Sequence, residues 1–286
     1  MNLLEIFDTV QKHDPEIFGR LDSRRQVMRS FANIGKKITL VSLPLVLSGM
    51  FQKAYGQSST TSAAVLDVLN FALTLEFLEY RFYQKGVSTP GLIPAGSDLA
   101  GITGIRDNEQ AHVNFLKTTI TALGGTPVTE PKWDFTAGSG SNNGPFASVF
   151  TNYQTFLAVS QTFEDTGVRA YKGQAGNLLQ QGDILQAALN IHSVEARHAS
   201  HIRQLRKLNN FGDLKPWITL NDPAVGSANS LVAASYNGEE VTTQAGVNII
   251  NIGGQSGVTA SIASECFDEP LTKSQVLSIV MPFIAK

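Results

Sequence analysis

Two short motifs, E-Q-A-H at residues 109–112 and E-A-R-H at residues 195–198, decide how this chain folds and what it can bind. Each motif sets a glutamate and a histidine three residues apart, so that on a helix both side chains lie on the same side. The stripes around them are apolar, with Leu116 continuing the first pair's face and Ile202 the second's. Charges on a stripe that packs into a core are costly unless they are paired or bound to a metal. The repeated motif therefore predicts a buried polar site between two helices.

Two further glutamates stand on helix-like segments of their own. Glu76 lies in L-T-L-E-F-L-E-Y-R-F-Y and Glu164 in S-Q-T-F-E-D-T-G-V-R-A-Y, and a tyrosine follows each seven residues later, at Tyr83 and Tyr171. Each glutamate precedes the glutamate of the next Glu-x-x-His motif by a similar distance, 33 residues in one case and 31 in the other. The chain therefore contains one pattern twice, a helix with Glu-x6-Tyr followed by a helix with Glu-x-x-His.

Glycine, proline and the apolar periodicity divide this region into four expected helices. They cover residues 63–85, 105–123, 146–172 and 183–208. The links within each half are shorter and favour antiparallel neighbours, whereas residues 124–145 form a long link rich in Gly, Ser, Asn and Pro. At about 3.3 Å per residue, such a link can cross the roughly 30 Å of a 20-residue helix. We therefore expect an all-α fold, a four-helix bundle with a long crossover between helices 2 and 3.

This arrangement resembles the ferritin-like superfamily of dinuclear carboxylate proteins, whose sites take a Glu from each of two helices and a Glu-x-x-His from each of the others. The helix with L-x-F-L-E-Y-x-F-Y and the F-D-E-P-L-T ending at residues 267–272 are more closely similar to the bacterial exported ferritin-like domain family that includes desiccation-related proteins. The resemblance covers residues 62–283. It implies a ferritin-like four-helix bundle over residues 62–210 and a C-terminal extension over residues 211–286.

The same resemblance implies a metal centre in the bundle. Its ligands would be two bridging glutamates and one Glu–His pair at each of two metals: Glu109 and Glu195 as bridges, Glu76 with His112, and Glu164 with His198. Glu79 lies one turn from Glu76 and is an alternative ligand on that helix. The matching tyrosines seven residues after Glu76 and Glu164 favour Glu76.

Several residues beside the expected ligands have open roles. His192 and His201 flank the last Glu-x-x-His motif by three residues, either as surface or capping histidines or as supporting groups or extra ligands. The two tyrosines either orient carboxylates or fill core volume. Asp107 and Asp165 point elsewhere on their helices, and we expect them in solvent.

The donor types narrow the metal and the chemistry. Oxygen and nitrogen ligands without thiolate suit iron or manganese more than copper or structural zinc. Four glutamates balance two divalent cations, so we expect two Fe or two Mn ions. The function that this centre favours is an oxidoreductase acting on peroxide or oxygen, or oxidising ferrous iron.

Other interpretations of the bundle stay open. A stress- or desiccation-protective or binding protein would use the same scaffold without catalysis, and the large extension favours that class. A bundle with buried Glu–His hydrogen bonds and no metal is a further alternative. A 24-subunit iron-storage cage fits poorly with the extension and with export, whereas a homodimer is compatible with the sequence.

The first 56 residues have the build of a signal peptide. The paired arginines in S-R-R-Q-V-M, residues 23–28, resemble a twin-arginine export signal, although Val27 stands where that family prefers Phe. An apolar run of 13 residues follows at 38–50, and small residues close it near residue 56. We expect an exported protein, periplasmic or extracellular. An uncleaved membrane anchor is the alternative, but the run is short against the about 20 apolar residues that a bilayer needs.

Composition supports a soluble, mildly acidic exported part. The chain has 286 residues, 16% of them charged, and a net charge of -2. Residues 1–56 hold 8 Lys and Arg against 5 Asp and Glu, which leaves 14 against 19, or -5, for the rest. This balance gives no electrostatic signature of nucleic-acid binding. The single cysteine, Cys266, excludes an intramolecular disulfide, and we expect it in the core.

The C-terminal residues lack helical periodicity over most of their length. Residues 211–260 are rich in Gly, Asn, Val and Ser, which is typical of an irregular extension with short strands. Thr272 and Gln275 have the spacing of a capping box, so a short helix should begin there and end near Pro282.

Overall fold

The structure, a computed structural model, describes residues 63–221, 230–254 and 256–286. The expected signal peptide, residues 1–56, lies outside the described residues, so that interpretation stays a prediction. Within the described ranges, no helix combines the length and the apolar character needed to cross a membrane.

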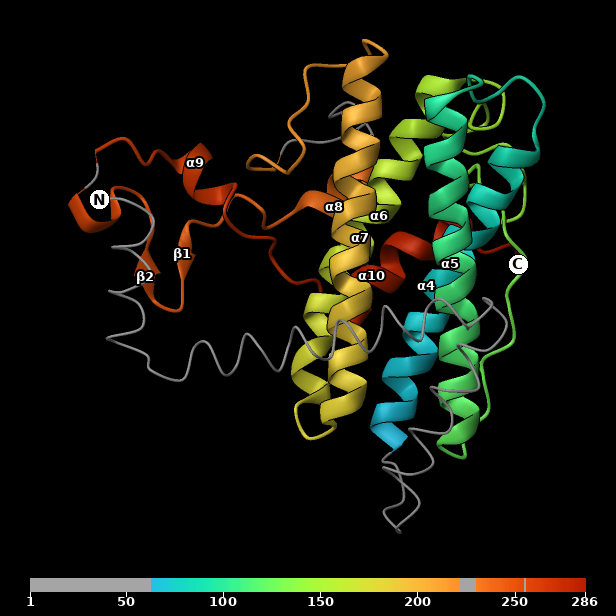
Figure 1. Cartoon of the computed structure of the whole chain (residues 1–286), viewed down its shortest axis with the longest axis horizontal. Helices are drawn as coiled ribbons and strands as arrows, with labels where there is room; N and C mark the ends of the chain where they lie inside the picture. The colour runs from blue at the N-terminus through green and yellow to red at the C-terminus, as the bar shows by residue number, and fades with distance from the viewer. Residues whose placement is uncertain (1–62, 222–229, 255) are drawn as a thin grey trace, which may run out of the picture. The chain divides into compact units, whose positions relative to one another are not determined.

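Four long helices form a bundle, as expected (Figure 1). They are α4 (Ala63–Ser88), α5 (Ser97–Ala122), α6 (Tyr153–Ala175) and α7 (Gly182–Leu208). α4 packs along α5 and α6 along α7, and the two pairs meet through α4 with α6 and through α5 with α7. The prediction of an all-α bundle with a C-terminal extension is confirmed.

The second helix begins eight residues earlier than the sequence pattern suggested, at Ser97. Gly101 and Gly104 look like helix breakers in the sequence, yet both lie inside α5. A β-carbon at Gly101 would collide with the imidazole of His201 on α7, so glycine there lets the two helices approach closely. The helical pattern of the sequence is weak around Gly101 because close packing between α5 and α7, and not helix propensity, requires glycine at this position.

The third helix begins seven residues later than expected, at Tyr153. Asn152 is its N-cap, and its side-chain oxygen accepts a hydrogen bond from the backbone N–H of Thr155 at 2.9 Å. The crossover before it is folded around Asp134. Its carboxylate accepts hydrogen bonds from the backbone N–H groups of Thr136, at 3.0 Å, and Gly140, at 2.8 Å.

The C-terminal extension follows the bundle with short elements. They are α8 (Ser230–Tyr236), the antiparallel pair β1 (Thr243–Gln244) and β2 (Val247–Asn248), η2 (Ile252–Gly254), α9 (Ala260–Ser264), α10 (Lys273–Val280) and η3 (Met281–Phe283). The capping box of Thr272 and Gln275 is present at the start of α10, as predicted. The boundary between bundle and extension at residue 210 stays a prediction, since both belong to one compact unit.

Buried charges attach the extension to α6. Arg169 is buried, donates hydrogen bonds to the backbone oxygens of Ser235 and Asn237, and pairs with Glu239 at 2.7 Å. On the same helix, Asp165 accepts from Arg203 at 2.5 Å and from Tyr236 of α8 at 2.7 Å. These ion pairs lie out of water, so losing one partner would leave an uncompensated buried charge.

Two expectations from the sequence are wrong here. Asp165 is buried and not in solvent, because its partners come from α7 and α8, which the sequence does not reveal as neighbours. Cys266 is exposed and not a core residue, because it follows the one-turn helix α9 on the surface of the extension. Asp107 is exposed, as expected.

Candidate metal centre

The bundle core brings together the six side chains that the sequence singled out. They come from all four helices: Glu76 from α4, Glu109 and His112 from α5, Glu164 from α6, and Glu195 and His198 from α7. All four glutamates have 0% exposure, and the two histidine side chains are 12% and 6% exposed. Ionised groups at such depth are rare in proteins unless they have a compensating charge.

His112 lies among three carboxylates. Its Nδ1 is 3.1 Å from Oε2 of Glu76, 3.1 Å from Oε2 of Glu109 and 3.3 Å from Oε1 of Glu195. One imidazole N–H cannot serve three acceptors well, and a cation would satisfy all of them. The four residues present ligand atoms that lie within 4.8 Å of one another.

His198 lies in a second, similar group. Its Nδ1 is 2.7 Å from Oε1 of Glu109 and 3.4 Å from Oε2 of Glu164. These three residues and Glu195 again present ligand atoms within 4.8 Å of one another. Glu109 and Glu195 belong to both groups, so each has a position suited to bridging two neighbouring ions.

Unsatisfied polar atoms indicate that the pocket suits a cation. Oε1 of Glu109, Oε2 of Glu164, both oxygens of Glu195 and Nδ1 of His198 are buried without an aligned hydrogen bond. The short distance between His198 and Glu109 thus brings the two atoms together without hydrogen-bond geometry. Buried carboxylate oxygens without partners are costly, and a metal ion would remove that cost. The donor set therefore fits a metal.

Without metal, protons compensate the buried charge. Burial raises the pKa of Glu76 to about 7. Burial, together with the charge of Glu109, raises the pKa of Glu195 well above its usual range, and burial also raises that of Glu164. Glu109 is the exception: burial raises its pKa, but the two imidazoles beside it, His112 and His198, outweigh this effect and lower the pKa below its usual range. The metal-free centre therefore keeps several of its carboxyl groups neutral.

Both histidines are cationic in the metal-free centre. Burial lowers the pKa of His198, but the neighbouring carboxylates of Glu164 and Glu109 outweigh burial and raise the pKa to about 11. The carboxylates around His112 raise its pKa in the same way, against the effect of burial. The two imidazolium ions thus supply positive charge where a metal would otherwise supply it.

Two tyrosines hold the carboxylates of the opposite half of the bundle. Tyr83 of α4 donates its hydroxyl hydrogen bond to Oε1 of Glu164 on α6, at 2.5 Å. Tyr171 of α6 donates in the same way to Oε1 of Glu76 on α4. The repeated Glu-x6-Tyr pattern is therefore reciprocal, because each tyrosine serves the glutamate of the other copy. Of the two roles left open for these tyrosines, the hydrogen bonds favour the orienting one.

Glu79 lies beside the centre but in neither group of ligand atoms. It is buried, and burial together with the charge of Glu195 raises its pKa well above the usual range. Gly167 on α6 makes room for it, since a β-carbon there would lie 3.1 Å from Oε1 of Glu79 and from Oε2 of Glu195. Gly167 is not among the site residues predicted from the sequence, although it follows Glu79 by 88 residues, the same offset that separates Glu164 from Glu76.

The remaining candidates lie further out. His192 and His201 are on α7 but in neither ligand group, and burial lowers the pKa of each. Asn108 is a further residue of the site that the sequence did not predict, and its Nδ2 lies 3.1 Å from Nε2 of His198. A second ring nitrogen with a partner fixes the orientation of an imidazole. Asn108 precedes Glu109 and gives no periodic signal of its own.

The model of the ferritin-like domain family matches residues 64–208, just over half of the chain. The chain belongs to the ferritin-like domain family. The matched range begins in α4 and ends with α7, so it contains all six residues of the two candidate ligand groups. A search of curated proteins finds no match.

The metal-free protein should lose stability as the pH rises from 5 to 8. The pKa of Glu76 is about 7 in the folded chain against an ordinary 4.5. The stability that its protonation contributes is therefore fully present below pH 4.5 and is lost as the pH rises through 7. The raised pKa values of Glu79 and Glu195 also lower the stability of the folded chain as the pH rises. Each such group contributes a slope of up to about 1.4 kcal/mol per pH unit.

Thermal unfolding in the presence of a chelator measures this effect. The Tm should be lower at pH 8 than at pH 5, and Glu76→Gln, which carries no titrating proton, should reduce the difference. A Tm that rises between pH 5 and pH 8 would contradict the assignment of neutral carboxyl groups to the metal-free centre.

Proposed function

We propose that this ferritin-like protein binds two iron or two manganese ions in the bundle and acts as an oxidoreductase on oxygen or peroxide, or on ferrous iron. One observation carries the proposal. Two groups of four candidate ligand residues share Glu109 and Glu195, and several buried oxygens of these groups have no aligned hydrogen bond. Such sharing is what a pair of adjacent ions requires.

The donor set favours iron or manganese. The six candidates offer carboxylate and imidazole groups with no thiolate, which suits these metals more than copper or structural zinc. Four carboxylates carry a charge of -4 when ionised, equal and opposite to two divalent cations. A bound pair of such metals would supply two neighbouring one-electron redox centres.

The protein's own side chains would control this site in two ways. The hydroxyl groups of Tyr83 and Tyr171 orient the carboxylates of Glu164 and Glu76, so that neither turns away from the centre. Glu79 is buried beside these carboxylates, and burial together with the charge of Glu195 raises its pKa, which favours the protonated form. Reduction of oxygen or peroxide consumes protons, and Glu79 could supply one.

A second candidate function is a protective or binding protein on the same scaffold, without catalysis. The resemblance to desiccation-related proteins supports it. The extension supports it too, because residues 230–254 and 256–286 are firmly attached to α6 yet contribute no ligand atom to either group. The two functions differ in whether the loaded centre turns over an oxidant.

Metal analysis and turnover of matched variants test the proposal. We expect about two metal ions per chain after reconstitution, and consumption of oxygen or peroxide that free metal does not match. Glu109→Gln keeps the side-chain shape but removes a shared carboxylate, so it should lose both metal and turnover. Asp107→Asn, an exposed acid two residues away on α5, is the control and should change neither.

Fewer than about 0.2 metal ions per chain after reconstitution would overturn the metal centre. Full occupancy without turnover of oxygen, peroxide or ferrous iron would instead support the protective scaffold.

Removing one orienting hydroxyl should weaken metal binding without unfolding the bundle. Tyr171→Phe deletes the hydrogen bond to Glu76, and loss of such a supporting contact costs about 10–100-fold in metal affinity. Tyr153→Phe, on the same helix but bonded to Asp98 at 3.0 Å, is the matched control. Equal affinities of the two variants, measured by chelator competition, would show that Tyr171 only fills space.

We also propose export with removal of the N-terminal segment. The arginine pair, the apolar run and the small residues before residue 57 support it. N-terminal sequencing of the protein recovered from its native host should find a mature chain that begins near residue 57. An intact N-terminus in the membrane fraction would support the uncleaved anchor instead.

A further inference from the structure

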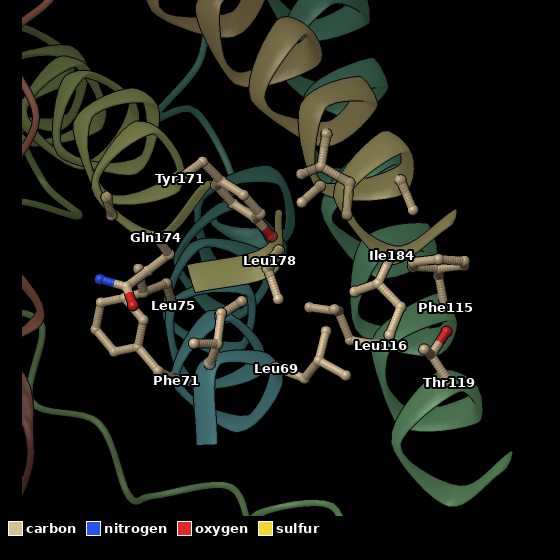
Figure 2. Close-up of a pocket in the computed structure, with 16 residues that line it drawn as sticks. Leu69, Phe71, Leu75, Phe115, Leu116, Thr119, Tyr171, Gln174, Leu178 and Ile184 are labelled. Carbon is tan, nitrogen blue, oxygen red and sulfur yellow. The ribbon is translucent and has the colours of Figure 1, made fainter. Parts of the chain in front are cut away.

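A small apolar cavity lies in the bundle core next to the candidate metal centre (Figure 2). Its volume is about 20 Å³, and all four helices line it. Leu116 lies one turn after His112 on α5, and Ile191 lies one turn before Glu195 on α7. On α4, Ala72 likewise precedes Glu76 by one turn. The cavity therefore continues the bundle core directly from the level of the ligands.

Tyr171 connects the two sites. Its ring lines the cavity, and its hydroxyl donates to Glu76 in the metal centre. Figure 2 shows this side chain at one end of the cavity, with Ile184 and Leu116 among the side chains opposite. The Tyr171 side chain thus lies between a molecule in the cavity and the carboxylate of Glu76.

The walls of the cavity are almost entirely hydrocarbon. Leucine, isoleucine, valine, alanine and phenylalanine side chains make up most of them. The polar lining residues are Thr119, Gln174 and Tyr171; Gln174 accepts a hydrogen bond from Asn177, and the Tyr171 hydroxyl is engaged by Glu76. Water in a cavity of this size needs two to four polar partners, and cavities without them stay dry. A small apolar molecule needs no such partners and gains dispersion contacts with the walls.

The cavity comes closest to solvent between α5 and α7. Most lining residues are buried, whereas Phe115 on α5 and Ala187 and Ala188 on α7 are only half-buried. Ala187 and Ala188 have small side chains, so α7 contributes little side-chain bulk at this edge. We take this edge as the entrance.

We propose that the cavity is a docking site for dioxygen on its way to the metal centre. The proposal rests on the proposed function and narrows its substrate, because an apolar diatomic gas suits these walls and hydrogen peroxide does not. Peroxide would lose its hydrogen bonds with water on entering and find almost no partners in return. Dioxygen loses none.

Xenon is the probe for the cavity, since it is an apolar atom whose binding needs no metal. We expect one xenon atom in the cavity in crystals of the metal-free protein under xenon pressure. Ala188→Phe should fill the entrance and exclude xenon, with Ala188→Val as a milder variant should the first fail to fold. Leu189→Phe, an exposed neighbour on α7, is the matched control and should keep the xenon site.

The metal-loaded protein gives the second readout. Ala188→Phe should raise the KM for oxygen about tenfold, the equivalent of about 1.4 kcal/mol of lost binding, while its metal content and its KM for peroxide stay unchanged. No xenon in the cavity of the wild-type protein would overturn the docking site, whatever metal the chain binds. Xenon binding with an unchanged KM for oxygen in Ala188→Phe would overturn it as well. A chain that binds xenon but no metal would refute the proposed function and the delivery of dioxygen to a metal centre, and would leave only the apolar gas-binding cavity.

Discussion

The burial of four carboxylates in an otherwise apolar core is the constraint on which the rest of this structure depends. Glu76, Glu109, Glu164 and Glu195 have no contact with water, and their mutual repulsion would open the bundle if nothing compensated it. Protons on the carboxyl groups and two imidazolium ions compensate it in the metal-free chain. Metal ions would do so more completely, since they also satisfy oxygens that have no hydrogen bond.

The compensation shapes the helices around it. Tyr83 and Tyr171 each cross to the opposite half of the bundle to hold a carboxylate. The two copies of the pattern differ where Glu79 meets Gly167, since a β-carbon at residue 167 would crowd the carboxylates of Glu79 and Glu195 at 3.1 Å. The candidate ligands of the two halves thus match, whereas the additional buried acid, Glu79, is present in only one of them.

The sequence predicts the parts of this structure that repeat. Glycine, proline and apolar periodicity predicted the four helices, and Glu-x-x-His on apolar stripes predicted a buried polar site. The meeting of all six polar side chains was implied by the resemblance to the ferritin-like superfamily. It did not predict that α5 begins at Ser97, because Gly101 is explained only by its contact with His201 on α7. The pairing of Asp165 with Arg203 was equally invisible, since single buried ion pairs carry no periodicity. Contacts between distant helices are where the prediction stopped.

The division of the ligands between the two helical hairpins has a consequence for assembly. The first group takes Glu76, Glu109 and His112 from the α4–α5 hairpin and only Glu195 from the other, and the second group has the reverse composition. Each hairpin alone thus offers three candidate ligands of one group, and the fourth belongs to the other hairpin. An ion captured early would favour docking, because it joins segments nearly 90 residues apart whose encounter is costly in chain entropy. A metal ion bound by these residues would therefore also link the two helical hairpins and stabilise the assembled bundle.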